Sequence, residues 1–151
     1  MQELASIENV VSNLLVRSRS QVKVKLASSF PGGRLVGGKY HLGTHTITLF
    51  IEEIKKQCLQ LFHTDVDFLS YLAIVLSHEI GHAEDGELVR LSDQLDRSIN
   101  QFERDRLALE IEENAWHYAA LLLEDIDTNL VDTVIYHSLR PYRDKLQMEI
   151  V

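Results

Sequence analysis

The sequence predicts an α+β fold in which a small antiparallel sheet packs with several helices. Two observations support this class. Apolar residues recur at helical spacing in the first 15 residues and again after residue 53, whereas residues 22–27 and 46–51 alternate as strands do. Five of the seven glycines fall between residues 32 and 43, which concentrates the turns around the predicted strands. Helix, sheet and further helices therefore follow one another along the chain.

The two periodicities predict the first elements in order. The first helix is indicated by apolar side chains at helical spacing, namely Leu4, Ile7, Val10, Val11, Leu14 and Leu15. Residues 22–27 predict a strand with one face in water. Residues 34–36 and 39–42 predict two short strands separated by a pair of glycines, and residues 46–51 predict a stronger strand because they are rich in β-branched side chains. We expect these segments to form an antiparallel meander of three or four strands.

The helical period returns after the strands. Residues 54–62 predict a short helix, and a longer one follows that is apolar on most sides and therefore central. Asp65 or Asp67 can cap this longer helix, and the pair Asp85-Gly86 is a suitable end for it. Three more helices are expected within residues 87–105, 106–124 and 129–139, the last of which Pro141 ends or kinks.

Length and composition exclude several classes of protein. The chain has 151 residues, which predicts a single domain spanning residues 1–151. Its 15 basic and 23 acidic residues give a formal net charge of −8, so we expect neither direct nucleic-acid binding nor a membrane-surface helix. The chain has no run of about 18 apolar residues, the length that a membrane-spanning helix needs. The first residues lack a basic segment followed by an apolar block, so no secretory signal is expected. Cys58 is the single cysteine, which favours a reducing, cytoplasmic location.

The motif that carries chemistry is His78-Glu79-Ile80-Gly81-His82, which has the pattern H-E-x-x-H inside the predicted central helix. Residues i and i+4 lie on one helix face, so both imidazoles can bind one metal ion at a Zn–N distance of roughly 2.0–2.1 Å. Glu79 is rotated about 100° from His78 around the helix. It can therefore stand beside the ion and accept a proton from metal-bound water. Without a metal, these three polar side chains on a largely buried helix would be costly.

A catalytic zinc ion needs a third protein ligand and an open position for water. The helix expected at residues 106–124 offers Glu110, Glu112 and Glu113. Glu112 lies at the edge of the apolar face of this helix. Glu113 is rotated about 100° further around the helix axis, and Glu110 lies on the far side. We therefore predict Glu112 as the third ligand, with Glu113 as the second choice.

These motifs resemble the gluzincin type of metallopeptidase and, more narrowly, the ImmA/IrrE family of small intracellular zinc peptidases. The resemblance rests on residues 78–83 and on Glu112-x-x-Ala115 followed by Tyr118-Ala119-Ala120. It implies a zincin-like fold, a bound Zn²⁺ ion and cleavage of a helix-turn-helix repressor. At the position of Trp116 the family usually has Asn or Asp, and that polar residue commonly orients a zinc-binding histidine. The resemblance also makes residues 46–51 the candidate edge strand for pairing with an extended peptide substrate.

The sequence thus predicts a zinc-dependent endopeptidase that acts on a protein substrate. His78, His82 and Glu112 would hold Zn²⁺, and Glu79 would act as the general base. Two other hypotheses stay open, a metal-binding regulatory or interaction domain without proteolytic activity and a metal-free helical binding protein. The oligomeric state is left open, and so is the group that stabilises the transition state, for which the candidates are Tyr71, Tyr118, Tyr136 and His137.

Overall fold

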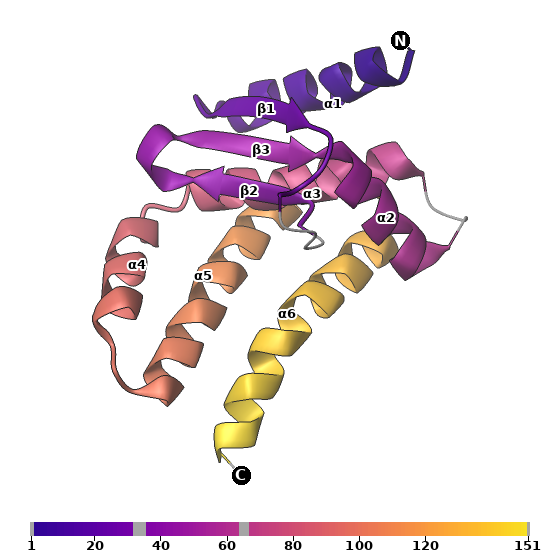
Figure 1. The fold of residues 1–151 in the computed structure, drawn as a ribbon. Coiled ribbons are helices and arrows are strands. Elements are labelled where there is room, and N and C mark those ends of the chain that lie inside the picture. Colours follow the sequence, from indigo (N-terminus) through magenta and orange to yellow (C-terminus); the bar gives the residue numbers. More distant parts are fainter. Residues whose placement is uncertain (1, 32–35, 64–66, 151) are drawn as a thin grey trace.

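The computed structural model describes residues 2–31, 36–63 and 67–150. Helices and strands follow one another in the order α1 (Gln2–Ser18), β1 (Lys23–Ala27), β2 (Gly38–His41), a 3₁₀ turn η1 (Leu42–Thr44), β3 (Thr46–Phe50), α2 (Ile51–Phe62), α3 (Phe68–Ala83), α4 (Leu88–Arg97), α5 (Gln101–Leu122) and α6 (Thr128–Ile150). The predicted α+β class is confirmed (Figure 1). None of the described helices is both long enough and apolar enough to cross a membrane.

The sheet is mixed, so the expected antiparallel meander is wrong for one of its two pairings. Strand β3 lies between the other two, antiparallel to β2 and parallel to β1. The turn η1 joins β2 to β3 as a hairpin. In contrast, ten residues, 28–37, separate β1 from β2, which is far longer than a tight hairpin turn. This length lets β1 pair with the far side of β3. Residues 34 and 35 of the predicted strand 34–36 lie outside the described part of the chain.

The expectation that residues 46–51 form an edge strand is also wrong. They form the central strand β3, whose Ile47 and Leu49 are fully buried, and Ile51 already belongs to α2. The strand richest in apolar and β-branched residues takes the position where burial is greatest. The edges of the described sheet are therefore β1 and β2, and β2 is the edge that lies beside α3 (Figure 1).

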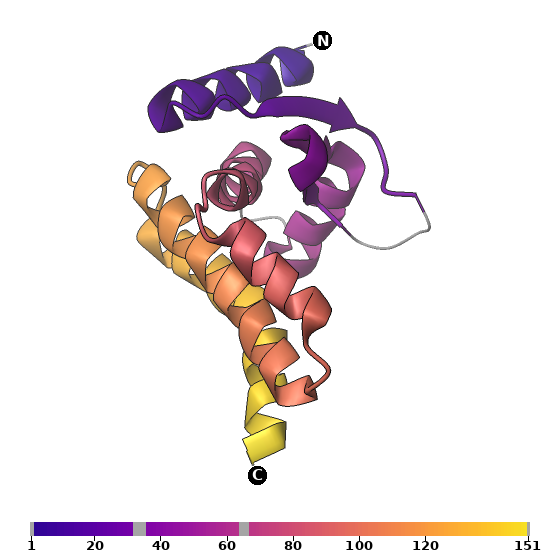
Figure 2. The same ribbon diagram turned by 90° about the vertical axis from the view of Figure 1, so that its left-hand side faces the viewer.

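Helix α3 occupies the centre of the molecule, as its apolar sequence predicts. Viewed nearly along its axis, it lies between α1 and β1 on one side and α4, α5 and α6 on the other (Figure 2). Asp67 caps its first turn, because the carboxylate accepts a hydrogen bond from the amide of Leu69 at 3.2 Å. The alternative cap Asp65 lies outside the described residues. The helix ends at Ala83, just before Asp85.

The helices after α3 begin and end at other residues than the sequence suggests. Asn100 caps α5, since its side chain accepts a hydrogen bond from the amide of Glu103 at 3.0 Å, so α5 begins before residue 106. The segment 87–105 therefore holds α4 and the first turn of α5. Pro141 does not end α6, which continues to Ile150. A proline inside a helix removes one backbone hydrogen bond, and Pro141 lies at an exposed position of α6.

Candidate metal centre

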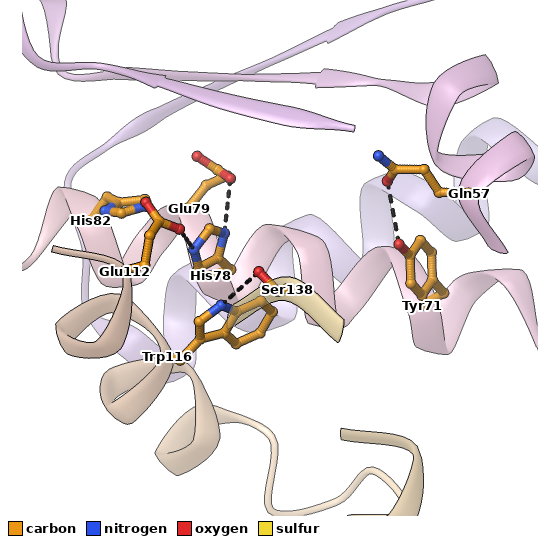
Figure 3. A network of polar contacts seen from close by, with 8 residues as sticks. All are labelled: Gln57, Tyr71, His78, Glu79, His82, Glu112, Trp116 and Ser138. Carbon is orange, nitrogen blue, oxygen red and sulfur yellow. Dashed lines mark hydrogen bonds and ion pairs between the residues drawn. The ribbon is translucent and has the colours of Figure 1, made fainter. Parts of the chain in front are cut away.

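The three predicted metal ligands meet between α3 and α5. His78 and His82 project from one face of α3, with ring centroids 4.6 Å apart. From α5, the Oε1 atom of Glu112 lies 2.9 Å from Nε2 of His78, and its Oε2 atom lies 3.2 Å from Nε2 of His82 (Figure 3). None of the three side chains is more than 16% exposed. Two helices thus bring together residues that lie 34 positions apart.

This donor set fits a divalent metal ion. Ligand atoms about 2.0–2.1 Å from a tetrahedral zinc ion lie about 3.3 Å from one another. The two contacts of Glu112 with the imidazoles, at 2.9 and 3.2 Å, are close to that separation. In addition, His78, Glu79 and His82 each offer a ligand atom within 4.8 Å of the others. Two imidazole nitrogens and a carboxylate are the ligands that catalytic zinc takes in many enzymes.

The neighbouring acids of α5 point elsewhere. The carboxylate of Glu113 lies 3.5 Å from the guanidinium of Arg143, and the carboxylate of Glu110 lies 3.5 Å from that of Arg106 on the surface. Both side chains are more than a third exposed, at 37% and 39%. Of the three acids weighed in the sequence, only Glu112 contacts the histidines.

The cluster holds opposite charges close together. Burial disfavours the charged form of His78, but hydrogen bonds to Glu112 and Glu79 outweigh it and raise the pKa of His78 to about 9. Burial also disfavours the charged form of Glu112, and hydrogen bonds from His78 and His82 nevertheless hold the pKa of this carboxyl well below its usual range. At neutral pH the metal-free cluster therefore pairs a protonated His78 with an ionised Glu112.

Glu79 is buried beside the cluster and bonded to it. Only 6% of the residue is exposed, and its Oε2 atom lies 3.1 Å from Nδ1 of His78. This contact favours a proton on Nδ1. In the neutral ring Nε2 then carries no proton and can bind a metal ion. Strand β2 passes directly over Glu79, because a Cβ atom at Gly38 would lie 2.9 Å from its Cγ atom. A larger residue at this position would therefore displace the Glu79 side chain.

Two cavities flank the cluster. The larger, of about 520 Å³, is bordered by α2, α3 and α6 and is lined by Tyr71, Val75, Val134 and Tyr142 among others. The smaller, of about 360 Å³, extends the other way and is lined by Tyr40, Leu42, Leu88 and Ser92 among others. Both are also lined by Gly38, His78, Glu79 and Glu112. The cluster thus stands at the junction of two hollows that lie along β2.

The structure separates the candidates for transition-state stabilisation. Tyr71 and His137 line the larger cavity, although the hydroxyl of Tyr71 is directed to the side-chain oxygen of Gln57 at 3.2 Å (Figure 3). Tyr136 is 53% exposed, and neither Tyr136 nor Tyr118 lines either of the two cavities beside the cluster.

Sequence reasoning missed Tyr142, which lines the larger cavity from α6. Burial and the negative charges of Glu112 and Glu79 raise its pKa, so the phenol keeps its proton and can donate a hydrogen bond. The signal was the spacing of residues 134, 138 and 142, which share one helix face and all line this cavity. The sequence predicts that this helix ends before Pro141, so Tyr142 is not expected on it.

Trp116 also contacts the cluster, but by stacking. Its ring lies 4.3 Å from that of His78, with 18° between the planes, and its Nε1 atom donates a hydrogen bond to Oγ of Ser138 at 3.0 Å (Figure 3). Trp116, at the position where the ImmA/IrrE family usually has Asn or Asp, thus places an aromatic ring against His78.

No known protein family, curated protein or solved structure matches this chain. The zincin-like fold and the ImmA/IrrE resemblance stay predictions from the sequence.

Proposed function

We propose that this chain is a zinc-dependent endopeptidase with a zincin-like catalytic centre. His78, His82 and Glu112 would hold the ion. The observation that carries the proposal is the convergence of Glu112 on both histidines, at 2.9 and 3.2 Å, from a different helix. Two imidazoles and one carboxylate are ligands typical of a hydrolytic zinc site. The buried Glu79 beside them would supply the general base.

When bound, the ion would polarise the scissile carbonyl and lower the pKa of water. The chain's own residues then move the protons. Glu79 accepts a proton from the attacking water and transfers it to the amine nitrogen when the C–N bond breaks, so the carboxylate is regenerated. Tyr142 lines the larger cavity, and in this mechanism it would donate a hydrogen bond to the carbonyl oxygen as negative charge develops there.

A polypeptide in extended conformation fits this site best as substrate. Cavities on both sides of the cluster leave room for chain before and after the scissile bond, which favours internal cleavage over removal of a terminal residue. Strand β2 is an edge of the described sheet and borders both cavities through Gly38. An extended segment could therefore pair with β2. The resemblance to ImmA/IrrE peptidases makes a helix-turn-helix repressor the protein substrate to try first.

The test compares two neighbouring acids of α5. We expect the wild type, purified with zinc present, to hold about one zinc ion per chain and to cleave an unfolded protein substrate. Glu112→Gln should lose the ion and the activity, because a neutral amide replaces the ligand. Glu113→Gln is the matched control, since Glu113 pairs with Arg143, and it should keep both. A wild type without zinc, or a Glu112→Gln variant with full zinc content, would contradict the proposal.

One observation favours a second candidate, a metal-binding regulatory domain without proteolytic activity. The Oε2 atom of Glu79 lies 3.1 Å from Nδ1 of His78, a contact typical of a carboxylate that only orients a metal ligand. Replacement of Glu79 by Gln distinguishes the two candidates, because only the peptidase needs its carboxylate as a base.

A further inference from the structure

Trp116 stacks directly on one histidine of the cluster. It lies four residues after Glu112 on α5, so both side chains project from the same face of that helix. Only 4% of the residue is exposed, and its ring stacks on His78 with 4.3 Å between centroids and 18° between planes. The stack covers one face of an imidazole whose two nitrogens are directed to carboxylates.

The indole is itself held from a third helix. Its Nε1–H group is the only polar group of the side chain, and it donates to Oγ of Ser138 on α6 at 3.0 Å. This bond fixes the rotation of the indole about its own axis, since another orientation would leave a buried donor without its partner. A continuous chain of contacts therefore runs from α6 through Trp116 to His78.

The contacts of His78 act in complementary directions. Glu79 and Glu112 bind the ring nitrogens at 3.1 and 2.9 Å and so restrain the ring at its edge. Trp116 packs against its face and restrains tilting out of that plane. Removal of either restraint leaves the imidazole free to move in one of these directions.

We infer that Trp116 and Ser138 are positioning residues that hold the imidazole of His78 in the orientation needed to bind the metal ion. This inference rests on the proposed zinc site. Groups that orient a metal ligand without touching the ion typically contribute about 10–100-fold to metal affinity. Here an indole face supplies the orientation that a hydrogen-bonding side chain usually supplies.

Direct titration of the metal-free full chain with Co²⁺ and Zn²⁺ tests the inference without any activity assay. We expect Trp116→Leu to weaken metal binding about 10–100-fold, because the ring loses the contact on its face. Ser138→Ala should weaken binding by about tenfold while it leaves the packing in place. Thr133→Ala is the matched control on α6, since its hydroxyl donates a hydrogen bond to the carbonyl of Asn129 on the same helix, at 2.7 Å. This control should bind metal like the wild type.

Trp116 also supplies a built-in signal, because it is the single tryptophan of the chain. We expect paramagnetic Co²⁺ to quench its emission with saturation at about one equivalent, and His78→Ala to abolish that response. Circular dichroism checks that each variant is folded. If Trp116→Leu does not fold, the metal affinity of Ser138→Ala tests the positioning role.

The outcomes separate the two proposals. Unchanged metal affinity in folded Ser138→Ala and Trp116→Leu, with only a lower melting temperature, would overturn the positioning role and leave the zinc site intact. A wild type that binds neither ion would overturn both.

Discussion

Gly81 of α3 packs directly against the main chain of Ala115 on α5. A Cβ atom at Gly81 would overlap the carbonyl of Ala115 and lie 2.9 Å from its Cα atom. Gly81 immediately precedes His82, and Ala115 lies three residues after Glu112. The closest approach of the two helices therefore falls beside the residues that they contribute to the cluster, and the missing side chain sets the distance between them.

A substitution at this contact is expected to affect stability and metal binding together. Gly81→Ala should destabilise the metal-free protein by up to about 2 kcal/mol, because overpacking costs about 1–3 kcal/mol and the better helix propensity of alanine offsets roughly 1 kcal/mol of that cost. It should also weaken zinc binding by separating Glu112 from the histidines. Urea unfolding and metal titration measure the two effects. Gly86→Ala, with open space around the added methyl group, should change neither. Wild-type stability in Gly81→Ala would contradict this prediction.

Replacement of Glu79 decides whether it is a base or only orients His78. Glu79→Gln keeps the shape of the side chain and a carbonyl oxygen that can still accept from Nδ1 of His78. We expect it to retain zinc and to lose about 10²–10⁴-fold in kcat/KM for peptide cleavage. Zinc content and cleavage rate are measured on the same preparation. A variant that retains both zinc and its full function would favour the regulatory candidate.

Tyr142 is expected to act on the turnover step. Tyr142→Phe removes the hydroxyl alone, and loss of a hydrogen-bond donor at a developing oxyanion typically costs about 10²–10³-fold in kcat. KM and zinc content should change little. Tyr136→Phe is the control, because Tyr136 lies on the same helix and is 53% exposed. Equal kcat values for the two variants would remove Tyr142 from the mechanism.

Metal affinity is expected to rise with pH. In the metal-free protein, contacts with Glu112 and Glu79 raise the pKa of His78 to about 9, so His78 is protonated at neutral pH. Because a metal ion binds only the neutral imidazole, its uptake displaces this proton. The dissociation constant should therefore fall by about tenfold per pH unit between pH 7 and 8.5, with the release of about one proton. Calorimetry in buffers of different ionisation enthalpy measures that proton. A dissociation constant independent of pH over this range would argue against a protonated His78.

Local periodicity predicts the parts of the site that depend on one helix at a time. The spacing of His78 and His82 places both on one face whatever surrounds them, and the apolar face of α5 distinguishes Glu112 from Glu110 and Glu113 before any contact is known. Their convergence agrees with that expectation because both helices bury those faces against each other.

Features that depend on what lies opposite a residue could not be predicted in this way. Alternation is the same in parallel and antiparallel strands, so the sequence does not show that β1 runs parallel to β3. Likewise, a helical wheel shows that Trp116 faces inward, but not that His78 and Ser138 lie on either side of it. Tyr142 was missed because the proline rule ended α6 too early.

Pro141 divides α6 into two parts with different surroundings. Its missing amide leaves the carbonyl of His137 without the usual helical partner, next to the larger cavity. Among the α6 side chains whose burial the structure describes, the buried apolar ones, Val131, Val134 and Leu139, all precede the proline. The C-terminal turns of α6 extend away from the sheet (Figure 1). The part of α6 after Pro141 is thus held by surface contacts such as the Arg143–Glu113 ion pair, whereas the part before it is held by buried apolar side chains. Tyr142 directly follows Pro141 and lines the larger cavity, so a bend of α6 at the proline would move the Tyr142 hydroxyl relative to that cavity.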